Sequence, residues 1–132
     1  MSTGPTVVRL LTLVDVVEAA RDRVSFSARL EAVLADGRRA LLLDDRGWTI
    51  GSNTVGDLRT ELSAQEIEED ARTVVGPDEP PDGRSQEEES ALHWGSLAET
   101  LRRAGIAADA SQLSRLPHDV VLSDRARALA VG

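Results

Sequence analysis

The chain contains no lysine, no cysteine and no tyrosine, and each absence removes a class of chemistry. Without lysine there is no Schiff base and no Walker A phosphate loop. Without cysteine there is no thiol nucleophile, thiolate metal ligand or disulfide, and without tyrosine there is no phenolic acid. The glycines are dispersed and form no dinucleotide-binding motif. We therefore expect no catalytic residue, no metal site and no cofactor.

Aromatic side chains are also scarce, since Phe26, Trp48 and Trp94 are the only three in 132 residues. The core must be built almost wholly from Leu, Val and Ala, which still fold well when they fill its volume. The length fits one domain. Arginine as the sole basic residue, with abundant Ala, Gly and Val, is typical of a high-GC bacterial genome rather than of a function.

The charge balance is acidic, with 23 Asp and Glu against 15 Arg, giving a net charge of -8. Clustered cations that would bind phosphates are missing, so we expect no nucleic-acid partner. The apolar run near the N-terminus is interrupted by Arg9 and Asp15, which argues against a secretory or membrane segment. With no cysteine to form disulfides, the expectation is a cytoplasmic protein without a membrane partner.

The clearest structural pattern is a β-meander in the first half. Residues 24–34 alternate between apolar and polar side chains, as a strand with one buried face does. Asp36-Gly37 then predicts a hairpin turn into a second strand over 39–43. A tight turn at 44–47 and a third short strand over 48–51 complete the predicted meander.

Helices are predicted wherever a capping residue precedes helical spacing of apolar residues. Thr12 and Asp15 predict a helix over 13–22, preceded at 6–11 by a strand or the entry to that helix. Ser63 predicts a helix to about residue 75, and residues 55–62 hold a possible helical turn. The C-terminal part is predicted to contain helices begun by Ser96, or earlier near Gln86, and by Asp109 and Ser123, with a short strand at 120–122.

These elements predict an α+β fold: an antiparallel β-meander of three to four strands with helices packed on one face. Residues 1–76 form the α+β core, and 91–132 form a helical segment that completes the same domain. Residues 77–90 hold three of the five prolines and many carboxylates, so we expect a flexible, acidic, Pro-rich loop between them.

Concentrated carboxylates are the feature that points to a function. Glu66, Glu68, Glu69 and Asp70 crowd one predicted helix, although like charges four residues apart destabilise it slightly. This arrangement favours a non-catalytic protein-binding module that covers a basic partner, as an immunity protein or chaperone does. The predicted partner-binding residues are Asp44, Asp45, Trp48, Glu66, Glu69, Asp70, Asp78, Glu79, Glu87 and Glu88.

Two other interpretations remain open. A small enzyme or metal-binding protein would use Asp44, Asp45, His93, His118 and Asp119, which must then converge in one pocket. Glu89 and His93 would share a helix face if the helix begins near Gln86, but His118 and Asp119 point to opposite sides of an extended chain. The third interpretation is a structural subunit or homodimer that buries an exposed aliphatic helix face against its own copy.

Overall fold

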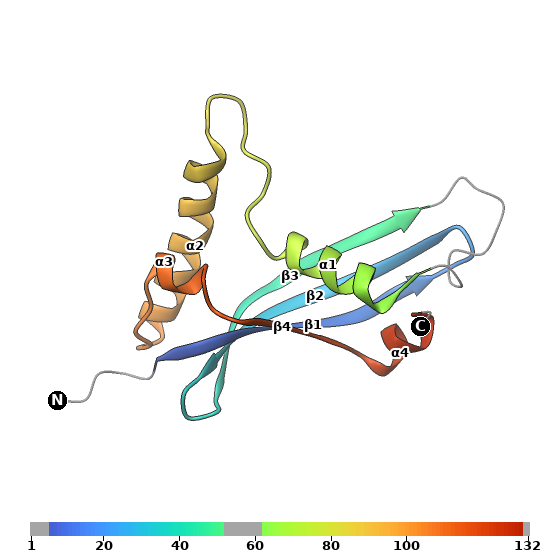
Figure 1. Cartoon of the computed structure of the whole chain (residues 1–132), viewed down its shortest axis with the longest axis horizontal. Helices are drawn as coiled ribbons and strands as arrows, with labels where there is room; N and C mark the ends of the chain where they lie inside the picture. Colours follow the sequence, from blue (N-terminus) through green and yellow to red (C-terminus); the bar gives the residue numbers. More distant parts are fainter. Residues whose placement is uncertain (1–5, 52–61, 131–132) are drawn as a thin grey trace.

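The computed structural model describes residues 6–51 and 62–130 of the chain and has an α+β fold (Figure 1). The expected helical turn over 55–62 lies outside the described residues except for Leu62. Within them the strands are β1 (Val7–Ala19), β2 (Arg23–Leu34), β3 (Arg39–Gly51) and β4 (His118–Leu122). The helices are α1 (Ala64–Val74), α2 (Gln86–Arg103), α3 (Ala110–Leu113) and α4 (Asp124–Leu129).

The described strands form one mixed sheet in the order β3-β2-β1-β4. β1, β2 and β3 pair antiparallel, but β4 lies parallel to β1. The prediction of a purely antiparallel sheet is therefore wrong. A parallel pair needs a long crossover connection. Here the chain that contains α1, α2 and α3 provides it, and returns β4 to the far side of β1 (Figure 1).

The helix predicted over 13–22 is wrong, because residues 7–19 form the long strand β1. Leu10, Thr12, Val14 and Val16 are buried in alternation with partly exposed neighbours, as in a strand with one covered face. Thr12, expected to cap a helix, is instead buried, and its hydroxyl is 2.6 Å from Nε2 of His118. Pairing with β2 on one side and β4 on the other overrides the local helical signal.

The tight turn predicted at 44–47 is also wrong, since β3 runs without a break from Arg39 to Gly51. The β2–β3 register shifts twice, once on each side of the pair between Leu30 and Leu43. The shift between Ala28 and Leu30 places Asp44 and Asp45 opposite a single residue of β2, as in a β-bulge. A Cβ on Gly47 would lie 2.6 Å from the carbonyl oxygen of Phe26, so glycine is required there by close approach of two backbones. Bulges and turns select similar residues, which explains the misassignment.

Several other predicted boundaries agree with the structure, but β4 begins two residues before the predicted strand at 120–122, and α2 takes in the last five residues of the predicted loop at 77–90. Gly37 has a φ of +90° in the β2–β3 hairpin, and Gly105, with a φ of +80°, follows α2. Ser63 and Ser123 cap α1 and α4 by accepting hydrogen bonds from backbone amides three residues later. Asp109 caps α3 in the same manner two residues later. Helix α2 begins at Gln86, after the cap Ser85, so residues 86–90 are helical and Ser96 lies inside the helix.

Two apolar clusters share the even-numbered side chains of β2. Ala28, Leu30, Ala32 and Leu34 belong to the first cluster, together with buried residues of α2 and α3. Val24 and Phe26 belong to the second, which also contains buried residues of α1 and α4. Among the described residues, no helix is long and apolar enough to cross a membrane.

Candidate functional site

Trp48 lies in an open hollow between the C-terminal half of β3 and helix α1. The hollow has a volume of about 480 Å³ and is lined by Trp48, Thr49, Ile50, Gly51, Asp70, Thr73 and Val74. The indole ring of Trp48 stacks on the ring of Phe26, with the two ring centroids 4.9 Å apart. This stacking restricts the orientation of the indole. Trp48 is half-buried, so one end of its side chain remains at the surface of the molecule. We call this the Trp48 hollow.

The acidic residue of the Trp48 hollow is electrostatically unusual. Burial raises the pKa of Asp70, and the negative charges of Glu66 and Glu69 raise it further. Glu66 lies one helical turn before Asp70, where like charges repel. Helix α1 therefore holds a carboxylate whose ionised form is disfavoured in this environment, beside an aromatic ring.

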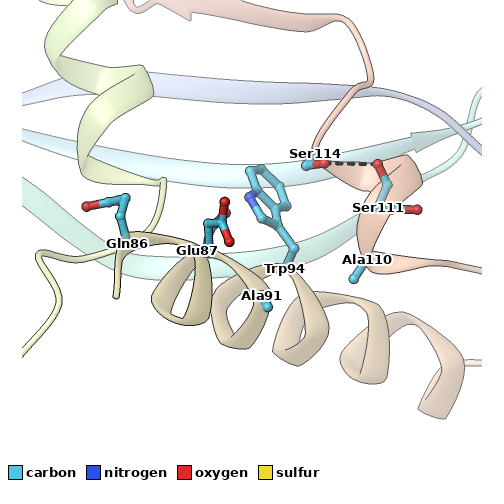
Figure 2. A pocket seen from close by; sticks show the side chains of 8 residues that line it. Gln86, Glu87, Ala91, Trp94, Ala110, Ser111 and Ser114 are labelled. Carbon is cyan, nitrogen blue, oxygen red and sulfur yellow. Dashed lines mark hydrogen bonds between the residues drawn. The ribbon is translucent and has the colours of Figure 1, made fainter. Parts of the chain in front are cut away.

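A second open hollow, of about 490 Å³, lies between α2 and α3. We call it the Trp94 hollow, and its lining consists of Gln86, Glu87, Ser90, Ala91, Trp94, Ala110, Ser111 and Ser114. Figure 2 shows the indole of Trp94 between the two helices, with the carboxylate of Glu87 on the same side of α2. The small side chains around it leave the space open. The half-buried ring of Trp94 also packs against the first apolar cluster.

A smaller cavity, of about 220 Å³, lies among β3, the segment before α2, and α2 itself. Arg46 is 3.1 Å from Asp78, measured from Nη1 to Oδ1, and Arg84 is 2.7 Å from Glu89, measured from Nη1 to Oε2. All four side chains line this cavity together with His93. Because two cations face two carboxylates, the cavity has no strong net charge.

His93 has an environment that keeps its imidazole neutral. Burial lowers its pKa, and the charge of Arg46 lowers it further, against the opposing effects of Asp78, a backbone hydrogen bond with Val75, and Glu89. Its Nε2 has no hydrogen-bond partner among the described residues. Glu89 and His93 do line one cavity, as expected from a helix that begins near Gln86.

His118 lies in a different environment from His93. It contacts Thr12, and burial is the main cause of its lowered pKa, followed by the charge of Arg72. Its neighbour Asp119 forms an ion pair of 2.9 Å with Arg9. Within residues 6–51 and 62–130, no group of three or more Asp, Glu and His side chains could hold a metal ion. Of the candidate enzymatic residues, His93 lines the small cavity, whereas Asp44, Asp45, His118 and Asp119 line none of the three cavities described above.

The ten predicted partner-binding residues are spread over several elements. Trp48 and Asp70 line the Trp48 hollow, and Glu66 and Glu69 act on Asp70 from the same helix. Asp78 lines the small cavity, where it pairs with Arg46. Glu87 lines the Trp94 hollow. The remaining predicted residues, Asp44, Asp45, Glu79 and Glu88, are exposed on β3, on the segment before α2 and on the first turn of α2.

The sequence analysis did not place Trp94 among the candidate site residues, although it lines the Trp94 hollow. A usable signal was present, because Glu87, Ala91 and Trp94 recur at helical spacing once the helix begins at Gln86. Arg46 was also missed as the partner of Asp78, and no local pattern predicts a pair separated by 32 residues. Comparison with protein families, with curated proteins and with solved structures found no match to this chain.

Proposed function

We propose that this chain is a non-catalytic protein-binding module that covers a basic partner, in the manner of an immunity protein or a chaperone. One observation carries the proposal: each of the two tryptophans lies in an open hollow that also contains a carboxylate. Trp48 shares its hollow with Asp70, and Trp94 shares its hollow with Glu87. Tryptophan is the aromatic residue most attractive to cations, and it is enriched at the centres of interfaces.

The Trp48 hollow suits an arginine or lysine side chain of a partner. Trp48, Ile50 and Val74 offer apolar surface for the methylene groups of such a side chain. Asp70 offers its carboxylate to the cationic end, and Glu66 and Glu69 add negative potential from exposed positions on the same helix. A bound cation would reduce the electrostatic repulsion among these three carboxylates. Part of the binding free energy would therefore come from removing a repulsion that is present in the free protein.

The net charge of -8 also favours this class of partner. Complementary charge speeds the diffusional encounter of two proteins and suppresses wrong partners, and its effect decreases as salt rises. The two proposed anchor hollows lie on different elements, one at β3 and α1 and the other at α2 and α3 (Figure 1). A partner that fills both hollows would have to cover a broad surface, which is the behaviour expected of an inhibitor or chaperone.

As part of this proposal, the helices pack on a single face of the sheet. The Trp48 hollow then lies between β3 and α1, and the Trp94 hollow lies between α2 and α3. This packing is supported by the even-numbered side chains of β2, which are the ones that share apolar clusters with the helices. Odd-numbered positions such as Ser25, Ser27 and Arg29 lie on the other face and are at least partly exposed.

The test compares three immobilised proteins in a lysate of the source organism: the wild type, Glu66→Gln/Glu69→Gln/Asp70→Asn, and Glu18→Gln/Glu99→Gln/Asp124→Asn. Both triple variants lose the same negative charge, but the second loses it away from the hollows. A basic protein retained in stoichiometric amount by the wild type and the control, and lost from the first variant, is the expected result. Its association rate should decrease steeply with salt for the wild type and only weakly for the first variant.

Equal retention by the two triple variants would show that only overall charge matters, and would contradict a specific role for the Trp48 hollow. Trp94→Ala examines the second hollow in the same assay. Tryptophan fluorescence and circular dichroism of each variant establish that it is folded before its binding is compared. Absence of any stoichiometric partner for the wild type at low salt would contradict the proposed function itself.

A further inference from the structure

The sheet face opposite the helix-bearing clusters carries a compact set of aliphatic side chains. Cross-strand pairing places Leu11 beside Glu31, Leu13 beside Val121, and Glu31 beside Leu41. We call the surface formed by Leu11, Leu13, Glu31, Val33, Leu41 and Val121 the outer sheet face. None of these residues belongs to either apolar cluster of the described structure.

Two of the five aliphatic residues on this face are exposed to solvent. Val121 is 41% exposed and Leu41 is 42% exposed, on β4 and β3, the two edge strands of the sheet. Leu11, Leu13 and Val33 lie between them and are half-buried by their neighbours alone. Cross-strand pairing also places Arg29 beside Leu13, Arg39 beside Val33 and Asp119 beside Leu11, so aliphatic and charged side chains alternate on this surface. Protein interfaces commonly combine apolar groups with arginine in this way.

The charged side chains on and beside this face form ion pairs within the chain. Arg9 pairs with Asp119, Arg29 and Arg39 both pair with Glu31, and Arg125 pairs with Asp15. The four cations and three anions sum to +1, whereas the whole chain has a charge of -8. The acidic surplus of the molecule is therefore carried elsewhere.

Glu31, at the centre of the face, is already largely removed from water in the single chain. Its side chain is only 9% exposed, held between Arg29 at 3.0 Å and Arg39 at 3.4 Å. Much of the cost of removing this carboxylate from water is thus met in the isolated chain. A covering partner would add little to that cost.

We propose that the outer sheet face is the interface between two copies of this chain. Two molecules with a charge of -8 repel each other through their acidic surfaces, but not through a face that is close to neutral. A strongly basic partner would find no surplus of negative charge there among the described residues. A copy related by a twofold axis offers the same aliphatic rows in return, as an isologous interface requires.

The size of the face fits this assignment. β1, β2 and β3 are 12 or 13 residues long and β4 has 5 residues. At about 3.3 Å per residue and about 4.8 Å between strands, the whole side of the sheet on which the outer sheet face lies presents roughly 650 Å² per copy. Two copies would bury roughly 1,300 Å², at the lower end of stable specific interfaces. Stacked sheets pack about 10 Å apart with their strands aligned to within about 30°.

Sedimentation velocity over protein concentrations from about 1 to about 200 µM tests the proposal. The decisive comparison is between Leu41→Arg, on the outer sheet face, and Leu92→Arg, which alters a leucine that is 56% exposed on α2. The wild type and Leu92→Arg should dimerise with similar dissociation constants. Leu41→Arg should raise the constant by roughly 100-fold, because a symmetric interface receives each change twice. Val121→Arg should act in the same way.

The absence of cysteine provides a second measurement that does not depend on a disruptive change. A spin label on Ser27→Cys, on the same face of the sheet, should show a short distance between copies. The same label on Ser96→Cys of α2 should show a long distance or none. A wild type that stays monomeric at the highest concentration would overturn the proposal. Equal weakening by Leu41→Arg and Leu92→Arg, or no dipolar coupling at Ser27→Cys, would also overturn it.

Discussion

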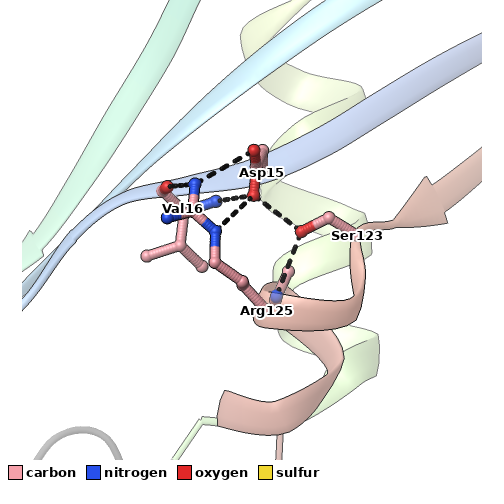
Figure 3. A network of polar contacts seen from close by, with 5 residues as sticks. Asp15, Val16, Ser123 and Arg125 are labelled. Atoms are coloured by element: carbon pink, nitrogen blue, oxygen red, sulfur yellow. Dashed lines mark hydrogen bonds and ion pairs between the residues drawn. The ribbon is translucent and has the colours of Figure 1, made fainter.

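Asp15 of β1 and Arg125 of α4 are 110 residues apart in the sequence, and Nη2 of the arginine lies 3.1 Å from Oδ2 of the aspartate. The same nitrogen donates to the carbonyl of Val16, while Ser123 donates its hydroxyl hydrogen to Oδ1 of Asp15 (Figure 3). Ser123 also accepts a hydrogen bond from the amide of Ala126 and so caps α4. One carboxylate therefore joins the start of the last helix to the middle of the sheet.

Asp15→Asn should weaken this attachment. Both side chains of the ion pair are well exposed, so solvent screening limits the expected loss to about 1 kcal/mol in the free energy of unfolding. Glu18→Gln is the matched control, because it removes a similar exposed pair with Arg23 that connects no helix to the sheet. Urea unfolding followed by tryptophan fluorescence measures both variants. An equal loss for the two would mean that the Asp15 network contributes no more than an ordinary surface pair.

The same carboxylate should make the protein sensitive to acid. The hydrogen bond from Arg125, followed by those from Ser123 and the Val16 amide, lowers the pKa of Asp15. A lowered pKa gives stability that is present above the unfolded value of about 3.9 and lost as the pH falls through the folded value. The stability difference between the wild type and Asp15→Asn should therefore shrink below about pH 4. A difference that stays constant from pH 7 to about pH 2 would contradict this assignment.

Gly47 and Gly95 should respond to alanine in opposite ways. A Cβ at Gly47 would approach the Phe26 carbonyl oxygen to 2.6 Å, so the bulged strand must shift, and we expect a loss of about 2 kcal/mol or more. A Cβ at Gly95, inside α2, meets no atom within 4 Å. Alanine should stabilise that helix by about 0.8 kcal/mol, because glycine has a low helix propensity. Thermal unfolding of both variants measures the contrast, and destabilisation by Gly95→Ala would contradict it.

Short sequence patterns correctly predicted one strand, one hairpin turn and three helix caps. The alternation in β2, the Asp36-Gly37 turn and the caps Ser63, Asp109 and Ser123 all lie where they were predicted. The prediction failed at 44–47, where the expected turn lies within the continuous strand β3, and at β1, whose helical spacing was overridden by pairing with two strands distant in sequence. Such pairing is a property of the whole fold, and a single-sequence pattern does not encode it.

In the candidate site, too, features set by local sequence were predictable and features set by long-range packing were not. The acidic surroundings of Asp70 follow from helical spacing, and were predicted together with Trp48. The hollow that contains them was not predictable, because it requires β3 and α1 to lie side by side. The neutral character of the outer sheet face depends likewise on ion pairs such as Arg9–Asp119, which join strands far apart in the chain.

The two histidines should give the protein a second, milder dependence on pH. Burial is the main cause that lowers the pKa of both His93 and His118. A lowered histidine pKa means that the unfolded chain binds protons first, so stability is lost as the pH falls from the unfolded value of about 6.5 toward the folded values. Urea midpoints should decrease between about pH 7.5 and about pH 5.5. His93→Gln/His118→Gln should remove most of this slope, and a slope left intact would exclude the histidines as its origin.

Asp70 offers the sharpest connection between stability and the proposed function. Burial and the charges of Glu66 and Glu69 raise its pKa, so the ionised form destabilises the free protein and protonation at lower pH relieves the cost. Asp70→Asn should therefore stabilise the free protein at pH 7, by a few tenths of a kcal/mol for each like-charge contact removed. It should also weaken binding of the basic partner, since the lost carboxylate is the one in the Trp48 hollow. Glu99→Gln, on α2, is a control that should produce neither effect. A stabilised Asp70→Asn variant with unchanged partner affinity would show that the crowded charge on α1 has no part in recognition.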